Sequence, residues 1–149
     1  MKPFQPLAWL VLSLMLCGIG AAESFGAELN LKAQLIWGSE EPLKDTKCPV
    51  VEGALAEKLK KVFKWKHYYE VKKADVAAPA DKPKRHTMSD KCQIELQSFG
   101  KADVEVKIFG EGKHLRTVRQ PIPPGEMLVL AGDDKNDTAW FVVLTNTSK

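Results

Sequence analysis

Two neighbouring segments in the second half of the chain alternate strictly between apolar and polar side chains. Because successive side chains of a strand point to opposite faces of the sheet, this period of two predicts strands with one buried face. A short Phe99-Gly100-Lys101 turn joins the two segments. The sequence therefore predicts an antiparallel β-hairpin. Its apolar positions are Cys92, Ile94 and Leu96 in the first segment and Ala102, Val104, Val106 and Ile108 in the second.

Further strands are predicted on both sides of this hairpin. Residues 28–37 alternate in the same way, and residues 65–73 and 115–120 are strand-like. Residues 127–131 and 139–144 are apolar throughout, which is typical of strands buried on both faces, for instance between a second sheet and a helix. Residues 74–84 are rich in alanine, proline and charge. They are expected to form an edge segment or a loop.

Residues 51–64 show the spacing of an amphipathic helix. Leu55, Leu59, Val62 and Phe63 form one apolar stripe. Lysines gather toward the C-terminal end of this segment, where they complement the helix dipole. The expected fold is therefore mainly β: an antiparallel β-sandwich, or an open barrel, of six to eight strands with one amphipathic helix over an end or a face.

The first 22 residues have the pattern of a secretory signal peptide. Lys2 gives a positive start, residues 7–20 are apolar, and small residues follow, so cleavage is expected after Ala22 or Ser24. We therefore divide the chain into a cleaved signal peptide, residues 1–22, and a single β-rich domain, residues 23–149. The apolar run is shorter than the ~20 residues of a membrane span, so a periplasmic or secreted protein with no stable membrane span is expected. The alternative is a lipid anchor at Cys17, although the bulky Leu16 before it fits that signal poorly.

Two cysteines follow the signal peptide, Cys48 and Cys92. In an oxidising compartment such a pair is more naturally a disulfide than two free thiols. We therefore expect a Cys48–Cys92 bridge, and the alternative is a buried Cys92 with an unpaired Cys48. The net charge of the chain is only +3 at pH 7. That balance, together with the export signal, argues against a nucleic-acid partner.

Residues 58–73 form the most distinctive candidate surface. They hold seven lysines, one acidic residue and four Phe, Trp or Tyr rings. Basic residues interleaved with aromatic ones can bind anionic polymers, since aromatic faces stack while ammonium groups neutralise charge. The competing interpretation is a solvated helix face followed by aromatic side chains that enter the core. The candidate contact residues are Lys60, Lys61, Lys64, Trp65, Lys66 and Tyr68.

The sequence carries no recognisable catalytic or cofactor motif. His67, His86 and His114 are too scattered to form a metal site, so neither a metal nor another cofactor is expected. An enzyme remains an alternative, because a fold can assemble a site from distant residues. It would be a small exported hydrolase that pairs His67 or His114 with Asp133 or Asp137.

The order of these features is similar to that of small exported bacterial proteins of unknown function. The resemblance is carried by the signal peptide, a lysine-rich helix that leads into an aromatic strand (KLKKVFKWKHYYEV), a run of hairpins (CQIELQSFGKADVEVKIFGEGKHL) and a glycine-containing turn before an apolar strand (LVLAGDDKNDTAWFVVL). The resemblance covers about residues 29–144. It implies a compact β-rich exported domain, and it implies no reaction and no site residues.

These observations favour a non-enzymatic module of the bacterial envelope or extracellular space. Its expected partner is an envelope or extracellular protein or an anionic glycan, contacted through the basic and aromatic residues 58–73. A small-ligand carrier is a further alternative. Its cavity between the sheets would be lined by Trp37, Phe109 or Trp140.

Overall fold

The computed structural model describes residues 28–135 and 138–149 of the chain. The predicted signal peptide and Cys17 lie outside these residues. The described elements are β1 (Leu29–Ser39), α1 (Gly53–Val62), β2 (His67–Ala78), β3 (Lys84–Thr87), β4 (Cys92–Ser98), β5 (Asp103–Gly110), β6 (Lys113–Pro121), β7 (Met127–Lys135) and β8 (Thr138–Asn146).

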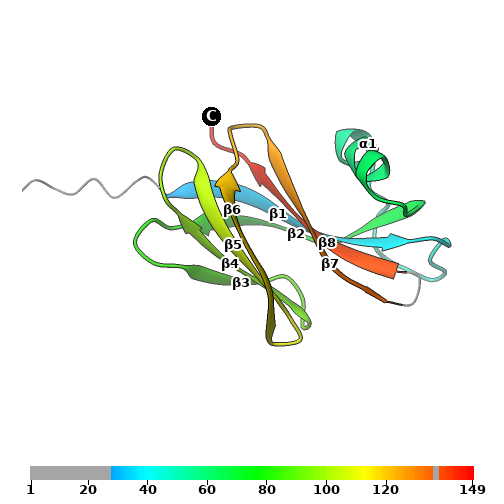
Figure 1. Cartoon of the computed structure of the whole chain (residues 1–149). Coiled ribbons are helices and arrows are strands. Elements are labelled where there is room, and N and C mark those ends of the chain that lie inside the picture. The colour runs from blue at the N-terminus through cyan, green and yellow to red at the C-terminus, as the bar shows by residue number, and fades with distance from the viewer. Residues whose placement is uncertain (1–27, 136–137) are drawn as a thin grey trace, which may run out of the picture.

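The strands form two antiparallel sheets of four strands each. Sheet A has the order β2-β1-β8-β7, and sheet B has the order β3-β4-β5-β6. Figure 1 shows the two sheets on either side of a common interior, with α1 on the face of sheet A that is turned away from sheet B. The predicted β-sandwich with one amphipathic helix is therefore confirmed.

The main core lies between the two sheets. The alternating apolar positions of β4 and β5 are buried there, as the period of two predicts. They meet the alternating apolar positions of β1 and the inward-facing residues of β7 and β8. The largest fully buried side chains of this core are Leu31, Met88, Ile94, Leu96, Ile108, Ile122 and Leu144.

Strand β8 is buried on both of its faces, which confirms the expectation drawn from its unbroken apolar run. Val142 and Leu144 belong to the main core between the sheets, whereas Phe141 and Val143 belong to a second cluster beneath α1. Strand β8 also lies between β1 and β7 in sheet A. Protein therefore covers β8 on every side. Its continuous run of apolar residues exposes little apolar surface to water.

Helix α1 is shorter than the predicted 51–64. It ends where Phe63 turns extended, at φ −120° and ψ 158°, while the Phe63 N–H still donates to the Leu59 carbonyl oxygen at 2.9 Å. Leu59 is buried, and Leu55 and Phe63 pack against the same second cluster. The prediction that Val62 belongs to the buried apolar stripe is wrong, because Val62 is 64% exposed on the solvent side of the helix.

Residues 74–84 form parts of two edge strands and the loop between them, in line with the predicted edge segment or loop. Residues 74–78 complete β2, where Val76 and Ala78 are buried and pair with Leu31 and Leu29 of β1. Lys84 already begins β3. The composition thus indicated an edge segment and a loop, but not the burial of Val76 and Ala78 against the main core.

The predicted Cys48–Cys92 disulfide is absent from the described residues, where both cysteines are free. Cys92 begins β4 of sheet B, and its side chain is part of the main core between the sheets. Cys48 lies instead in the loop before α1, next to Pro49, whose carbonyl oxygen accepts a hydrogen bond from the Glu70 N–H of sheet A. Cys92 is therefore buried between the sheets while Cys48 lies in a loop beside sheet A, and the structure has the unbridged alternative.

Candidate functional site

The outer face of sheet A, turned away from sheet B, has two halves of opposite character. One half is apolar and carries α1. The other half is polar, because β1 places there the side chains that alternate with its core residues. The apolar half includes Ile36, Tyr68, Phe141 and Val143, and the polar half includes Lys32, Gln34, Glu70, Asp75 and Thr145.

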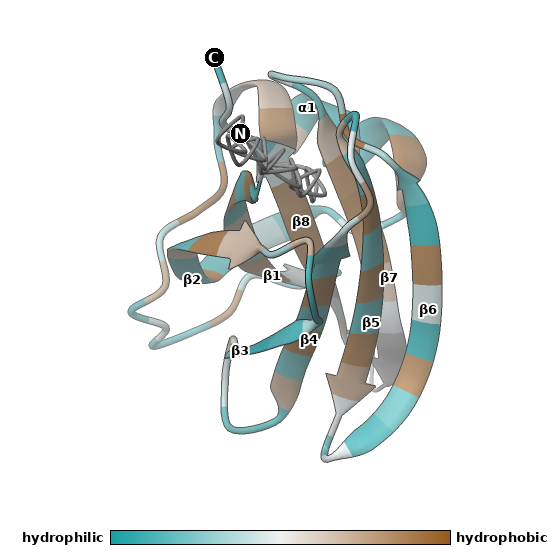
Figure 2. Cartoon of the chain, turned by 90° about the vertical axis from the view of Figure 1, so that its left-hand side faces the viewer, coloured by the Kyte–Doolittle hydropathy of each residue, from teal (hydrophilic) through white to brown (hydrophobic). Residues whose placement is uncertain are grey.

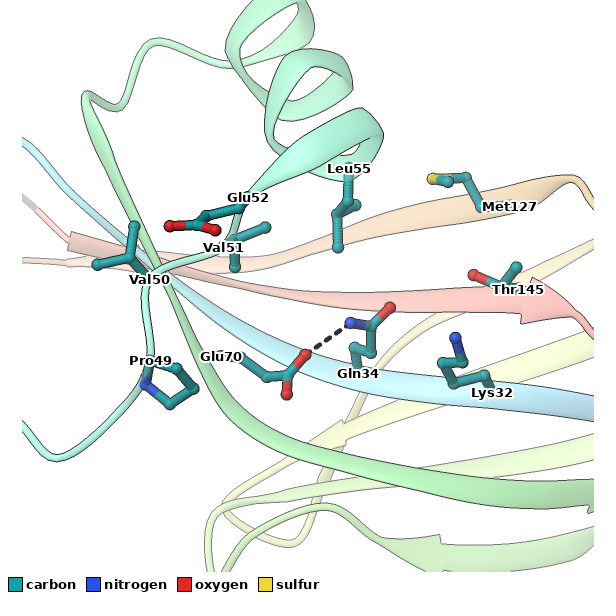
Figure 3. A pocket seen from close by; sticks show the side chains of 10 residues that line it. All are labelled: Lys32, Gln34, Pro49, Val50, Val51, Glu52, Leu55, Glu70, Met127 and Thr145. Carbon is teal, nitrogen blue, oxygen red and sulfur yellow. Dashed lines mark hydrogen bonds between the residues drawn. The ribbon is translucent and has the colours of Figure 1, made fainter.

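A pocket of about 330 Å³ lies at the boundary between these halves. Figure 3 shows Leu55 pointing from α1 toward Gln34, while Lys32 and Thr145 project from neighbouring strands into the same space. The Gln34 side-chain N–H donates to the Glu70 carboxylate at 2.7 Å. The remaining lining residues are Pro49, Val50, Val51, Glu52 and Met127.

This pocket combines an ammonium group, two carboxylates and an apolar wall. The ammonium belongs to Lys32, the carboxylates to Glu52 and Glu70, and the wall to Leu55 and Met127. Such a lining can hold a small molecule that carries both charged and apolar parts. None of its ten lining residues is a Ser, Cys or His, and its charged groups are carboxylates and an ammonium that can pair with opposite charges of a ligand.

The sequence did not single out this pocket. The alternating sequence of β1 predicted a polar face that includes Lys32 and Gln34. Such a face is ordinarily exposed to water and gives no indication of a pocket. What turns it into a pocket is the segment before α1, since the Val51 N–H donates to the Tyr68 carbonyl oxygen at 2.9 Å and fixes the helix above the sheet. No pattern in the sequence specifies that contact.

A second pocket, of about 560 Å³, lies where β1 and β2 of sheet A approach β3 of sheet B. His86 lines it, and its Nε2 atom is 3.0 Å from the Ala77 carbonyl oxygen. Asp75 and Lys84 also line it. His86 is thus held by the neighbouring strand, consistent with a locally satisfied histidine.

The structure separates the aromatic from the basic members of the predicted contact residues. Trp65 is 6% exposed and Tyr68 is 2% exposed, and both belong to the cluster beneath α1. The Tyr68 hydroxyl donates to the Leu59 carbonyl oxygen at 3.3 Å. Neither ring is presented on the surface as a stacking platform, which agrees with the competing interpretation of aromatics that enter the core.

The predicted lysines are all exposed. Lys66 forms an ion pair with Glu40, and the hydrogen bond to that carboxylate, together with its charge, raises the lysine's pKa. The Lys64 ammonium lies 4.7 Å from the centre of the Trp65 ring. Lys60 and Lys61 project from the last turn of α1. The structure therefore brings the lysines together around the C-terminal end of α1.

The histidines considered for a hydrolase lie on different sheets. His67 begins β2 of sheet A and is half-buried. His114 is an exposed residue of β6 in sheet B, and its Nε2 atom is 2.8 Å from the Thr117 hydroxyl. Asp137 and the side chain of Asp133 lie outside the described part of the structure. Among the described residues, no group of three or more His, Cys, Asp or Glu could hold a metal ion.

The three aromatic residues considered for a ligand cavity do not line either pocket described above. Trp140 packs against the main core, and Trp37 is its partner in the β1–β8 register. Phe109 lies beneath the Arg85 guanidinium, with 4.0 Å between that group and the ring centre. These residues therefore have structural partners of their own.

The fold and these surfaces define a two-sheet antiparallel β-sandwich with a helix docked on one outer face. Comparisons with models of protein families, with curated proteins and with solved structures find no match for this chain. Within the described residues, no helix is long and apolar enough to span a membrane.

Proposed function

We propose that this chain is an exported, non-catalytic module of the bacterial envelope or extracellular space that binds an acidic macromolecular partner. The contact surface is the lysine cluster, defined as Lys58, Lys60, Lys61 and Lys64. The partner is an envelope or extracellular protein or an anionic glycan. Export to the periplasm or beyond is supported by the signal-peptide pattern of residues 1–22.

The observation that carries this proposal is the division of α1 into a docked side and a basic side. Leu59 anchors the helix to sheet A with its side chain fully buried. The four lysines of the cluster are exposed, and the one acidic residue within α1 is Glu57. The Lys58 ammonium also donates to the Met127 carbonyl oxygen at 3.2 Å, which ties the cluster to β7.

A docked helix gives these charges a fixed spacing, so a partner can neutralise several of them at once. Exposed charges are screened by salt beyond about 8 Å at physiological ionic strength. Binding through this cluster should therefore weaken steeply as salt rises. Each exposed ion pair contributes only ~0.2–1 kcal/mol, so affinity depends on several lysines acting together.

The test compares two triple variants that remove the same charge. Lys60→Gln, Lys61→Gln and Lys64→Gln neutralise the cluster, whereas the control replaces the exposed Lys44, Lys82 and Lys91 with Gln. The probes are a sulfated polysaccharide and a poly-glutamate peptide, and the Kd is measured between low and physiological salt. The cluster variant should bind roughly 3- to 30-fold more weakly at low salt. Equal affinity of the two triple variants would contradict the proposal.

The small-ligand carrier remains a second candidate because of the pocket beside α1. Its volume of about 330 Å³ is at the lower end of the ~300–1,000 Å³ of known ligand sites. Screening the purified protein against small zwitterionic compounds tests this candidate. A hit should be lost in Thr145→Trp, which fills the pocket, and kept in the lysine-cluster variant.

A further inference from the structure

Strand β6 is the exposed outer strand of sheet B. Eight of its nine side chains are exposed, and Val118 alone is half-buried. One edge of β6 pairs with β5, and the other edge faces away from the sheet order β3-β4-β5-β6. Figure 2 shows β6 as a long, mostly hydrophilic strand at the edge of its sheet. Its outward N–H and C=O groups are therefore available to a further strand.

The other sheet edges in the described part of the chain are short or partly covered. Residues 49–51 cover β2, where the Glu70 N–H donates to the Pro49 carbonyl oxygen at 2.8 Å. Strand β3 has only four residues. The edge strand β7 receives a hydrogen bond from Lys58 at Met127. Strand β7 is as long as β6, and that one side-chain bond lies at its first residue. Strand β6 is thus a long edge that the described chain leaves open, and its charge distinguishes it from β7.

The charge of β6 decides which strand could pair with it. Its charged residues are Lys113, Arg116 and Arg119, and none of its nine residues is acidic. Arg119 forms an ion pair with Asp103 of β5 at 2.9 Å. Antiparallel pairing of β6 with a second copy of itself would bring like charges together, which is destabilising. Basic edge strands resist self-association in this way, but they favour an acidic strand.

Apolar groups lie beside the charges on the inner side of β6. Val118 pairs with the buried Val106, so it faces the core side of sheet B. Leu115, at the irregularity in the β5–β6 register, is 38% exposed and lies over Gly110. Arg116 pairs with the buried Ile108, so it lies on the same face of β6 as Val118. A partner strand whose alternate residues are acidic would place all of its carboxylates on one face of the extended sheet, beside Arg116.

We propose that the open edge of β6 binds an extended acidic segment of a partner protein, which adds a fifth strand to sheet B. Backbone hydrogen bonds supply part of the affinity, and acidic side chains opposite Lys113 and Arg116 supply the selectivity. This surface lies on sheet B, whereas the lysine cluster lies over sheet A. The inference therefore goes beyond the proposed function and can fail or hold independently of it.

The experiment uses the purified protein and three nine-residue peptides. The first alternates Glu with Val and Thr; the second has Lys in place of each Glu; the third is the first peptide with alternate backbone nitrogens methylated. We expect the first peptide to bind in the micromolar to low millimolar range, with backbone amide shifts along β6. We expect at least a tenfold weaker affinity for the second and third.

Matched double variants separate this edge from other exposed lysines. Lys113→Gln with Arg116→Gln should weaken the binding that shifts the β6 amides at least threefold, while Lys44→Gln with Lys82→Gln, which changes exposed lysines outside β6 and outside the lysine cluster, should leave it unchanged. The proposal is overturned if the acidic peptide does not bind at 1 mM and low salt. It is also overturned if the methylated peptide binds equally well, or if the amide shifts lie on α1 instead of β6.

Discussion

Trp140 lies directly over Gly132, so close that a Cβ atom on the glycine would stand 2.1 Å from the Cε2 atom of the indole ring. The two residues belong to the adjacent strands β8 and β7, where the register shifts between Ala131 and Asp134. Real side chains do not approach this closely. The absence of a side chain at position 132 is therefore what allows the Trp140 ring to pack against the main core.

Replacing Gly132 with alanine should destabilise the protein. The added methyl group must displace the Trp140 ring, and overpacking of this kind costs ~1–3 kcal/mol. Chemical denaturation of wild type and Gly132→Ala measures the loss. In the Trp140→Phe background the same glycine change should cost less, because a smaller ring can yield. Additive effects of the two substitutions would contradict the packing relationship.

The docking of α1 should depend on Leu59 and not on its neighbour Val62. Leu59 is fully buried beneath the helix, so Leu59→Ala should cost ~2–5 kcal/mol of unfolding free energy. Val62 is exposed, so Val62→Ala is a matched loss of apolar atoms on the same helix and should stay within ~0.5 kcal/mol. Similar losses for the two variants in urea denaturation would show that α1 does not pack as described.

The sequence predicted much of this fold because its strands carry their own periodicity. The alternation of Ile94 and Leu96, and of Val104 and Val106, specified which face is buried without knowledge of the partner sheet. The unbroken apolar run around Val142 indicated burial on both faces, and the structure shows the second sheet on one side and α1 on the other. Local pattern was sufficient in these elements because strand geometry alone decides where each side chain points.

The sites were less predictable, because they depend on contacts between distant segments. Trp65 and Tyr68 stand in a lysine-rich stretch, yet they are buried because α1 folds back over sheet A. Gln34 and Glu70 are 36 residues apart and meet only across the β1–β2 pairing. Composition reports what a segment contains, whereas a site depends on the direction in which each side chain faces.

The two thiols should react at very different rates in the folded protein. Burial raises the pKa of the Cys92 thiol to about 11, so little of the reactive thiolate forms at pH 8. Cys48 is half-buried in a loop. Brief treatment with iodoacetamide at pH 8, followed by peptide mass spectrometry, should label Cys48 and spare Cys92. Both should be labelled in denaturant, and recovery of a linked Cys48–Cys92 peptide would contradict the free thiols of the structure.

Stability should fall in alkaline solution as the pH rises from about 9. Burial raises the pKa of Cys92 from its ordinary 9.0 to about 11, and burial also raises the pKa of Tyr68 above its ordinary 10.0. Both groups are acids that are neutral when protonated, so the folded state holds their protons more tightly than the unfolded chain does. Their contribution is complete below pH 9, where both states are protonated. For Cys92 it is lost progressively between pH 9 and 11, because the unfolded chain ionises first.

Urea denaturation at several pH values between 7 and 11 measures this loss, and two variants assign it. Cys92→Ala removes the buried thiol, so its unfolding free energy should decline less between pH 9 and 11 than that of wild type, even if the variant is less stable at pH 7. Cys48→Ala removes a thiol outside the core and should retain the wild-type decline. If Cys92→Ala and Cys48→Ala gave the same slope with pH, the buried thiol would not be the group responsible. The comparison depends on slopes within each variant, so packing losses at neutral pH do not affect it.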